Sequence, residues 1–248
     1  LSSVWHTEAL EWLDKYLDVY KIGSGDLTAY PIIKEFAKRG KPIILSTGLS
    51  NLREINDTIN FLIKQNKKYK SKEYLSILQC TSSYPTADIE ANLKVITSLA
   101  KNKNITVGYS DHTIGSLALK SAYTLGAQVL EFHFTDTRKN KIFRDHWVSL
   151  THDETLELGK DLKRISCFLG TETKKPTVSE IKSNNIHTMR RAVYLSKDLN
   201  KGETIKENDL VYLRPNAGMD TKNFKKIIGK RARKNIKKLE KIIINKNV

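Results

Sequence analysis

Short apolar segments alternate with helix-like segments along the first two thirds of the chain, and this alternation limits the fold more than any other feature. Five segments are short, β-branched and almost continuously apolar, as buried parallel strands are; they span residues 18–22, 42–46, 75–80, 105–109 and 128–133. Between them, apolar residues recur at helical spacing, and Pro31 and Gly40 mark the start and the stop of the first such segment. The repeat predicts a parallel sheet with right-handed crossovers.

Polar residues at the strand ends distinguish between the two folds that such a repeat can form. An open doubly wound sheet binds ligands mainly at its switch point, but no G-x-G-x-x-G or Walker A sequence follows any of these strands. Here every strand ends in polar residues, as in a barrel whose site lies at the carboxyl ends of its strands. These residues are Lys21, Ser24, Asp26, Ser46, Thr47, Thr81, Ser82, Tyr84, Ser110, Asp111, His112, Glu131 and His133. The pattern predicts an α/β fold, a partial (β/α)₈ TIM barrel.

The character of the sequence changes after Gly170. Residues 174–176, Lys-Lys-Pro, are typical of a linker, and short apolar segments separated by turn sequences follow from about Arg190. We therefore expect a partial barrel over residues 1–172, a linker over 173–187 and a turn-rich domain over 188–248. The last part is small enough to be only marginally stable alone.

Positive charge is concentrated at the end of the chain. The 43 Lys and Arg against 27 Asp and Glu give a net charge of +16, and residues 221–248 hold eleven basic residues and one acidic residue. Such a stripe can bind nucleic acid. However, Phe224 is its only aromatic residue, and no zinc-ligand or RNA-binding signature accompanies it. We expect a solvated basic surface and no nucleic-acid partner.

Composition also indicates a cellular location. No segment approaches eighteen apolar residues, and the first residues lack the features of a signal peptide, so we expect no membrane span or leader. Two cysteines are too few for a disulfide scaffold, which indicates a cytoplasmic protein, and Cys80 is expected to be a packed strand residue. Because there is no initiator Met, we expect the chain to begin inside a larger protein.

Two histidines follow successive predicted strands and are candidate metal ligands. The imidazoles of His112 and His133 can bind a divalent metal, with Asp111 or Glu131 orienting them. An ordinary hydrogen-bonded histidine near the core is the alternative for each, and the residues alone leave both open. Lys21 is a candidate anion ligand, because a lysine on a buried strand rarely points into the core. Hydroxyl groups that could bind phosphate, or merely cap turns, belong to Ser24, Ser46 and Ser110.

Five motifs occur in an order and spacing typical of one enzyme family: YKIGSG from Tyr20, KPIILSTG from Lys41, QCTSSYP from Gln79, GYSDHT from Gly108 and EFHFT from Glu131. In these motifs the chain resembles the sialic acid (N-acetylneuraminate) synthases. The resemblance covers nearly the whole chain, and residues 190–248 resemble the family's antifreeze-like (SAF) domain. Members condense phosphoenolpyruvate with N-acetylmannosamine or a related 2-acetamido hexose and release phosphate, so the resemblance implies a transferase of surface-polysaccharide biosynthesis.

The resemblance implies a role for each site residue. His112 and His133 would bind Mn²⁺ or Mg²⁺, which polarises the sugar aldehyde. The carboxylate and phosphate of phosphoenolpyruvate would be held by Lys21, Ser24, Ser46, Ser82 and Ser110. Glu131 and Asp145 would bind or orient the sugar and the water on the metal, and Tyr84 would line the sugar pocket. Asp26 stands where many members have Glu and would bind substrate. Arg214 would reach the N-acyl group of the substrate from the other subunit of a domain-swapped homodimer.

The sequence also departs from the family pattern. Phe132 stands where many members have a basic residue, and residues 143–146 replace a more frequent Gly-Pro-Asp. These changes point to a different sugar, of the legionaminic or pseudaminic acid type. Five strands are expected where the family barrel has eight, and the match begins at the fourth. We therefore expect an N-terminally truncated member, inactive alone. The alternatives are an inactive scaffold or a basic nucleic-acid-binding remnant, and an aldolase with Lys21 as Schiff base.

Overall fold

The computed structural model describes residues 2–4 and 6–247, and the chain divides into two compact units, Leu1–Gly170 and Thr171–Val248. Each unit has its own apolar core. The two are described separately below.

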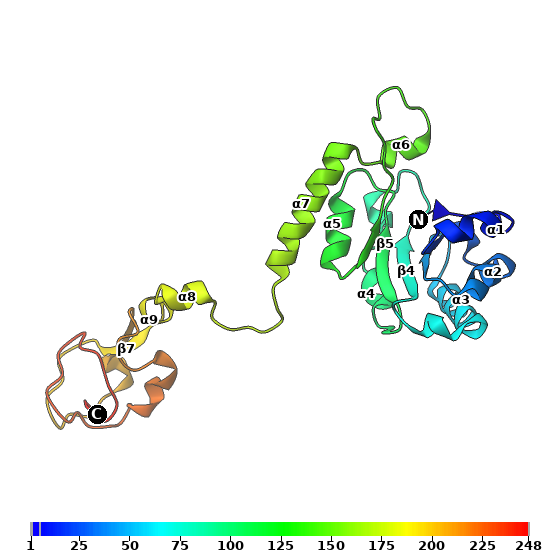
Figure 1. Ribbon diagram of the computed structural model, residues 1–248. Coiled ribbons are helices and arrows are strands. Elements are labelled where there is room, and N and C mark those ends of the chain that lie inside the picture. The colour runs from blue at the N-terminus through cyan, green and yellow to red at the C-terminus, as the bar shows by residue number, and fades with distance from the viewer. Residues whose placement is uncertain (1, 5, 248) are drawn as a thin grey trace. The chain divides into compact units, whose positions relative to one another are not determined.

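The first unit is built on a curled parallel sheet whose six strands follow one another in chain order. The strands are β1 (Ser2–Ser3), β2 (Tyr20–Ile22), β3 (Ile43–Ser46), β4 (Leu75–Cys80), β5 (Thr106–Ser110) and β6 (Val129–Glu131). The five predicted strands are all present. The expectation of five was nevertheless one short, because β1 pairs with β2 in parallel over two residues, too few to form a recognisable apolar pattern. Figure 1 shows β4 and β5 side by side within this sheet.

Helices connect the strands and cover the sheet. They are α1 (Ala9–Leu13), α2 (Tyr30–Arg39), α3 (Leu52–Gln65), α4 (Val95–Leu99), α5 (Leu117–Thr124), α6 (Arg144–Val148) and α7 (His152–Leu169). Their ends follow local chemistry: the Asn51 side chain accepts hydrogen bonds from the first turn of α3, and Gly40 ends α2 with a φ of 68°. Helices α5 and α7 pack against each other (Figure 1). No helix within residues 2–4 and 6–247 is long and apolar enough to cross a membrane.

The core of this unit is formed by side chains in register on neighbouring strands. Leu45, Ile77 and Val107 pair across β3, β4 and β5, and all three are buried. Burying such a side chain contributes about 1.5–3 kcal/mol. Because all strands are parallel, their carboxyl ends lie at one edge of the sheet, and the loops that follow them meet there.

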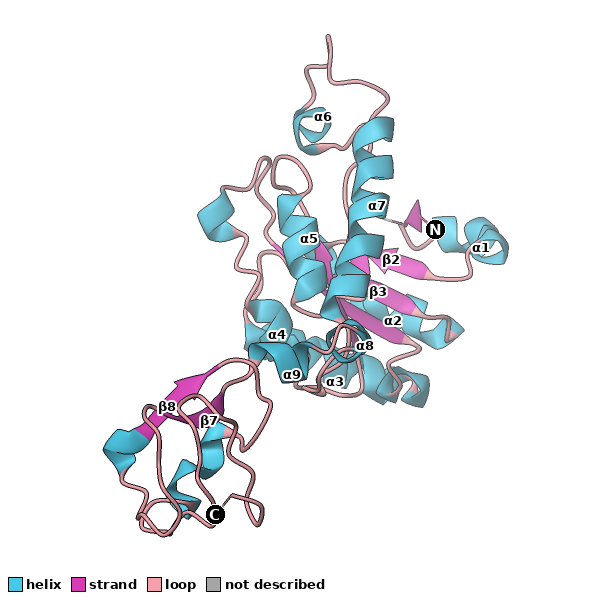
Figure 2. Cartoon of the chain, turned by 90° about the vertical axis from the view of Figure 1, so that its left-hand side faces the viewer, coloured by secondary structure: helices cyan, strands magenta, loops and turns pink. Residues whose placement is uncertain are grey.

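The second unit is smaller and mostly irregular. It contains α8 (Val178–Lys182) and α9 (Asn185–Met189), which lie in or next to the segment expected to be a linker, and the antiparallel pair β7 (Ala192–Leu195) and β8 (Leu210–Leu213). Figure 2 shows β7 and β8 side by side. The apolar core of the second unit is formed by Val193, Leu195, Leu199, Ile205, Met219, Ile227, Ala232, Ile236 and Ile242.

Candidate active site

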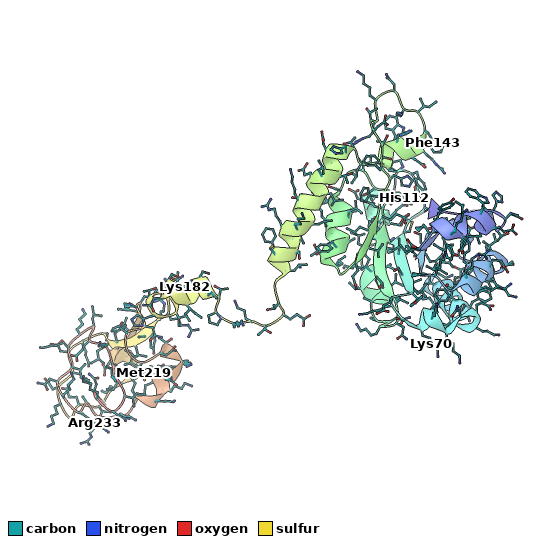
Figure 3. All side chains as sticks on the ribbon, viewed as in Figure 1. Lys70, His112, Phe143, Lys182, Met219 and Arg233 are labelled. Carbon is teal, nitrogen blue, oxygen red and sulfur yellow. The ribbon has the colours of Figure 1, made fainter. Side chains whose placement is uncertain are left out.

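The two histidines predicted to bind metal lie close together. Their ring centroids are 5.2 Å apart, and His112 follows β5 while His133 follows β6. The Tyr84 ring contacts both, at 4.0 Å from the His112 centroid and 5.7 Å from that of His133. The imidazoles therefore share one aromatic wall at the carboxyl end of the sheet, where Figure 3 labels His112.

The orientation of His112 is fixed by β4 and the residue that follows it. Its Nδ1 lies 2.7 Å from the carbonyl oxygen of Thr81, and since a carbonyl only accepts, Nδ1 carries the hydrogen and donates it. The same nitrogen is 3.9 Å from Cys80 Sγ. In the neutral ring this arrangement leaves Nε2 with a free lone pair, as a metal-binding imidazole requires.

The pKa values of the two histidines shift in opposite directions, although burial acts to lower both. Burial lowers the pKa of His133, and the neighbouring His112 lowers it further, against the opposing effect of Asp145 and Glu131. Burial also acts to lower the pKa of His112, but the hydrogen bonds with Cys80 and the Thr81 carbonyl outweigh it and raise that pKa. The lowered pKa of His133 favours its neutral form near pH 7, and the neutral form is the one that can ligate a metal.

Cys80 is more closely involved than its predicted role as a packed strand residue implies. It is buried, as expected, and burial acts to raise the pKa of its thiol. The contacts with His112, Ser24 and Ser110 outweigh burial and hold that pKa below its ordinary value. The strand register could have revealed this, because Cys80 pairs with Ser110, which in turn pairs with Glu131 on β6.

Asp145 lies beside His133, with Oδ2 3.7 Å from Nδ1 of the ring. Its other oxygen is 3.7 Å from Nε of Arg144, whose guanidinium lies 4.8 Å from the centroid of the Tyr84 ring. Arg144 was not predicted as a site residue. It comes from α6, and no pattern in the sequence indicates that this short helix folds over Tyr84.

A buried cation lies at the predicted phosphoenolpyruvate site. The Lys21 side chain is only 8% exposed, and its Nζ is 3.3 Å from Oε2 of Glu131. Ser110 Oγ donates to the other carboxylate oxygen of Glu131 at 3.1 Å. Lys21 Nζ also donates to the Ile22 carbonyl at 3.0 Å. Lys21, Ser110 and Glu131 thus form one connected group across β2, β5 and β6.

Three serines surround this end of β2, β3 and β4. Ser24 Oγ accepts a hydrogen bond from the backbone N–H of Gly48 at 2.9 Å. A methyl group added to Gly48 would lie 2.2 Å from Ser82 Oγ and 3.0 Å from Ser24 Oγ, so both hydroxyls face this glycine. Ser46 is buried, and within residues 2–4 and 6–247 its hydroxyl has no hydrogen-bond partner. An unpaired buried hydroxyl is costly unless a ligand satisfies it.

A hollow of about 1020 Å³ opens beside the serines. It is lined by Cys80 and Ser82 together with Thr47, the start of α3 and Val95 of α4. Lys21 and His112 are not among its lining residues, so it covers only the β3–β4 side of the candidate site.

Two predicted residues are not brought into this cluster. Asp26 ends the short turn Ser24–Asp26 and is half-buried, but among the described residues its side chain makes no hydrogen bond or ion pair with the others. Arg214 belongs to the second unit, is exposed and precedes a cis peptide bond to Pro215. The proposed contact of Arg214 with substrate in a dimer stays a prediction.

The donor groups at this end of the sheet provide two candidate histidine ligands for a divalent metal. Among residues 2–4 and 6–247, no three side chains of His, Cys, Asp or Glu gather closely enough to hold a metal by themselves. The two imidazoles, one with its Nε2 lone pair free, nonetheless fit a site with two nitrogen ligands and further positions open to substrate and water, as catalytic metal sites have. The carboxylates of Asp145 and Glu131 act electrostatically on His133 and suit a supporting role behind the ligands, not direct ligation.

Comparisons with known proteins bear on this arrangement. The NeuB family model matches residues 1–174, and the SAF domain model matches residues 190–242. N,N'-diacetyllegionaminic acid synthase from Campylobacter jejuni is 38% identical over 98% of this chain and 71% of its own length. Pseudaminic acid synthase from the same species is 35% identical over 95% of this chain and 66% of its own length.

A solved structure extends the comparison to three dimensions. The crystal structure of N-acetylneuraminic acid (sialic acid) synthetase from Leptospira borgpetersenii, in complex with citrate, superposes with a TM-score of 0.66 and 28% identity. The superposition covers 74% of this chain and 62% of that one. The chain spans 60–71% of the length of four curated relatives that it matches.

Proposed function

Because the chain belongs to the NeuB family and pairs a partial TIM barrel with a SAF domain, we propose that it catalyses the condensation of phosphoenolpyruvate with a 2-acetamido hexose to give a nonulosonic acid and phosphate. The observation that carries this proposal is the meeting of His112, His133 and Tyr84 at the same end of the sheet as Lys21. The site combines metal-type donors with a buried cation suited to an anionic substrate.

Binding of phosphoenolpyruvate is assigned to the β2–β4 side. Lys21 Nζ would offer a positive charge to the carboxylate or phosphate. Glu131 pairs with that ammonium group, and Ser110 donates a hydrogen bond to the other oxygen of Glu131. The hydroxyls of Ser24, Ser46 and Ser82 would donate to the remaining oxygens. A fixed cation and fixed donors stabilise developing charge without having to reorganise during the reaction.

Binding of the sugar is assigned to the other side. His112 and His133 would hold Mn²⁺ or Mg²⁺, which when bound supplies Lewis-acid polarisation of the sugar aldehyde. Tyr84 provides an apolar wall for the sugar, and Asp145 orients the ring of His133. In the reaction, C3 of phosphoenolpyruvate forms a bond to the aldehyde carbon, water adds at C2, and the C2–oxygen bond to phosphate breaks to leave a keto group.

A second candidate differs only in the sugar. The relative named as an N,N'-diacetyllegionaminic acid synthase is 38% identical to this chain. A diacetamido hexose is therefore the alternative to N-acetylmannosamine, with a product of the legionaminic acid type. We further propose that the chain acts as a homodimer in which Arg214 reaches the partner's sugar.

The test is phosphate release with phosphoenolpyruvate, Mn²⁺ and each sugar by a full-length version that supplies the barrel strands expected before residue 1. The chain alone is expected to release no phosphate. We expect His112→Ala and His133→Ala each to abolish the metal-dependent release. His152→Ala is the matched control, because His152 is exposed at the start of α7, and it should retain full activity. Normal turnover in both site variants would show that the metal assignment is wrong, and no release by the full-length version with any sugar would contradict the proposed reaction.

A further inference from the structure

We propose that Arg144 selects the sugar substrate by donating hydrogen bonds to an acceptor oxygen carried on C4 or C6 of the sugar, away from its aldehyde carbon. This inference rests on the proposed function, because it assumes that a sugar aldehyde is bound near the two histidines. The acceptor is the carbonyl oxygen of a second acetamido group or an oxygen of a phosphate.

The position of Arg144 carries the inference. Its guanidinium lies 4.8 Å from the centroid of Tyr84, and Tyr84 in turn lies 4.0 Å from His112. Figure 3 labels Phe143, the residue before Arg144, and His112 at the same end of the sheet. A sugar that extends from the histidines along Tyr84 therefore meets a positive charge beyond the aromatic ring.

Two cations of the loop that leads to α6 are already paired. Arg138 forms an ion pair with Glu154, and Lys141 lies 3.3 Å from Asp136. Among the described residues, Arg144 approaches a carboxylate only through Nε, which is 3.7 Å from Asp145. Its side chain remains 67% exposed, so the terminal nitrogens stay accessible to a ligand.

Stacking on Tyr84 suits Arg144 to this task. A guanidinium group held against an aromatic ring loses little further conformational freedom when it binds a ligand. The group is planar, and its N–H donors point outward in that plane. Carbonyl and phosphate oxygens accept such bonds in one plane. A hydroxyl oxygen is a weaker acceptor for a guanidinium than an amide carbonyl oxygen or a charged phosphate oxygen. A sugar with only hydroxyls at these positions should therefore depend less on Arg144.

The experiment measures sugar binding directly, by calorimetric titration in the presence of Mn²⁺ and phosphoenolpyruvate. The ligands are N-acetylmannosamine, its 6-phosphate and a 2,4-diacetamido-2,4,6-trideoxy hexose. We expect Arg144→Ala to weaken binding of the phosphate or the diacetamido sugar about tenfold or more, with a smaller effect on N-acetylmannosamine. The affinity of Arg144→Lys for these sugars should lie between that of the unmodified chain and that of Arg144→Ala. Lysine keeps the positive charge but lacks the planar guanidinium group.

Lys139→Ala is the matched control, because it removes a positive charge from an exposed residue of the same loop. It should bind every sugar as the unmodified chain does. The inference is overturned if Arg144→Ala binds all three sugars within twofold of the unmodified chain, or if Lys139→Ala loses as much affinity. If the unmodified chain binds none of the sugars, the proposed function fails, and the inference with it. Loss confined to the phosphate or to the diacetamido sugar supports the inference and identifies the acceptor.

Discussion

Replacing Gly48 by Ala should disrupt the phosphoenolpyruvate site while leaving the fold intact. The new methyl group would lie 2.2 Å from Ser82 Oγ, so this hydroxyl must move by about 1.2 Å to reach an ordinary contact of 3.4 Å. Ser24 Oγ and Cβ, at 3.0 and 3.2 Å, must also give way slightly. A displacement of about 1 Å breaks a hydrogen bond, whose length varies over only about 0.5 Å.

The expected magnitude follows from the bonds that are lost. One hydrogen bond to a charged group contributes about 1.5–3 kcal/mol, so the Kd for phosphoenolpyruvate should rise about tenfold to a hundredfold. Stability should change by less than about 1 kcal/mol. The φ of Gly48 lies outside the left-handed region, so alanine fits the backbone, and the displaced atom ends a rotatable side chain.

The assay is calorimetric titration of phosphoenolpyruvate, with thermal unfolding followed by circular dichroism on the same samples. Gly25→Ala is the matched control, because a methyl group there meets nothing within 4 Å and the φ of Gly25 is also outside the left-handed region. If Gly48→Ala binds phosphoenolpyruvate within twofold of the unmodified chain, or if Gly25→Ala weakens binding equally, the reasoning about this site is refuted.

Three further substitutions test the site and the fold. Ser46→Ala removes a buried hydroxyl that has no partner among the described residues, so stability should be unchanged or higher in urea unfolding, while phosphoenolpyruvate binds about tenfold more weakly. Gly108→Ala places a methyl group 2.4 Å from the backbone oxygen of Val129, which cannot easily move, and should cost about 3 kcal/mol or more in the same unfolding assay. The pKa of Asp209 lies below its ordinary value of 3.8, chiefly because Lys197 donates a hydrogen bond to its carboxylate. The ionised carboxylate therefore stabilises the fold above pH 3.8. This contribution to stability is lost as the pH falls through the lowered pKa. Asp209→Asn should cost about 1 kcal/mol at pH 7 and little at pH 2, as measured by urea unfolding at both pH values.

Each of these has a result that would contradict it. If Ser46→Ala lowered the stability of the fold, the Ser46 hydroxyl would have a protein partner, and the prediction would be wrong. Unchanged stability in Gly108→Ala would mean that β5 and β6 are further apart than described. A stability difference between Asp209→Asn and the unmodified chain that is the same at pH 2 and pH 7 would exclude a role for the charge.

The parallel sheet was predictable because its strands are buried on both faces. Such strands are nearly continuous in apolar content, and Ile43–Ser46 and Leu75–Cys80 both follow this rule. Ser2–Ser3 could not be found in the same way, because a two-residue polar strand owes its pairing to its neighbour β2 and not to its own sequence.

The site was predictable where side chains follow strands and unpredictable where loops fold over them. His112 and His133 were expected together because consecutive parallel strands end at one edge. Cys80 was underrated because its contact with His112 depends on the register between β4 and β5. Arg144 was missed because a loop sets its position over Tyr84, and a loop's path depends on tertiary contacts.

The strictly sequential order of β1 to β6 has a consequence for local opening. Each strand pairs only with those just before and after it, so within the described residues β2, β3, β4 and β5 have two partners each, while β1 and β6 have one. Residues of β6 are also only half-buried, whereas those of β4 are almost all buried. Backbone amides should therefore exchange with solvent fastest in β1 and β6 and slowest in β4, a fraying gradient that places Glu131, on β6, in a less protected strand than Cys80, on β4.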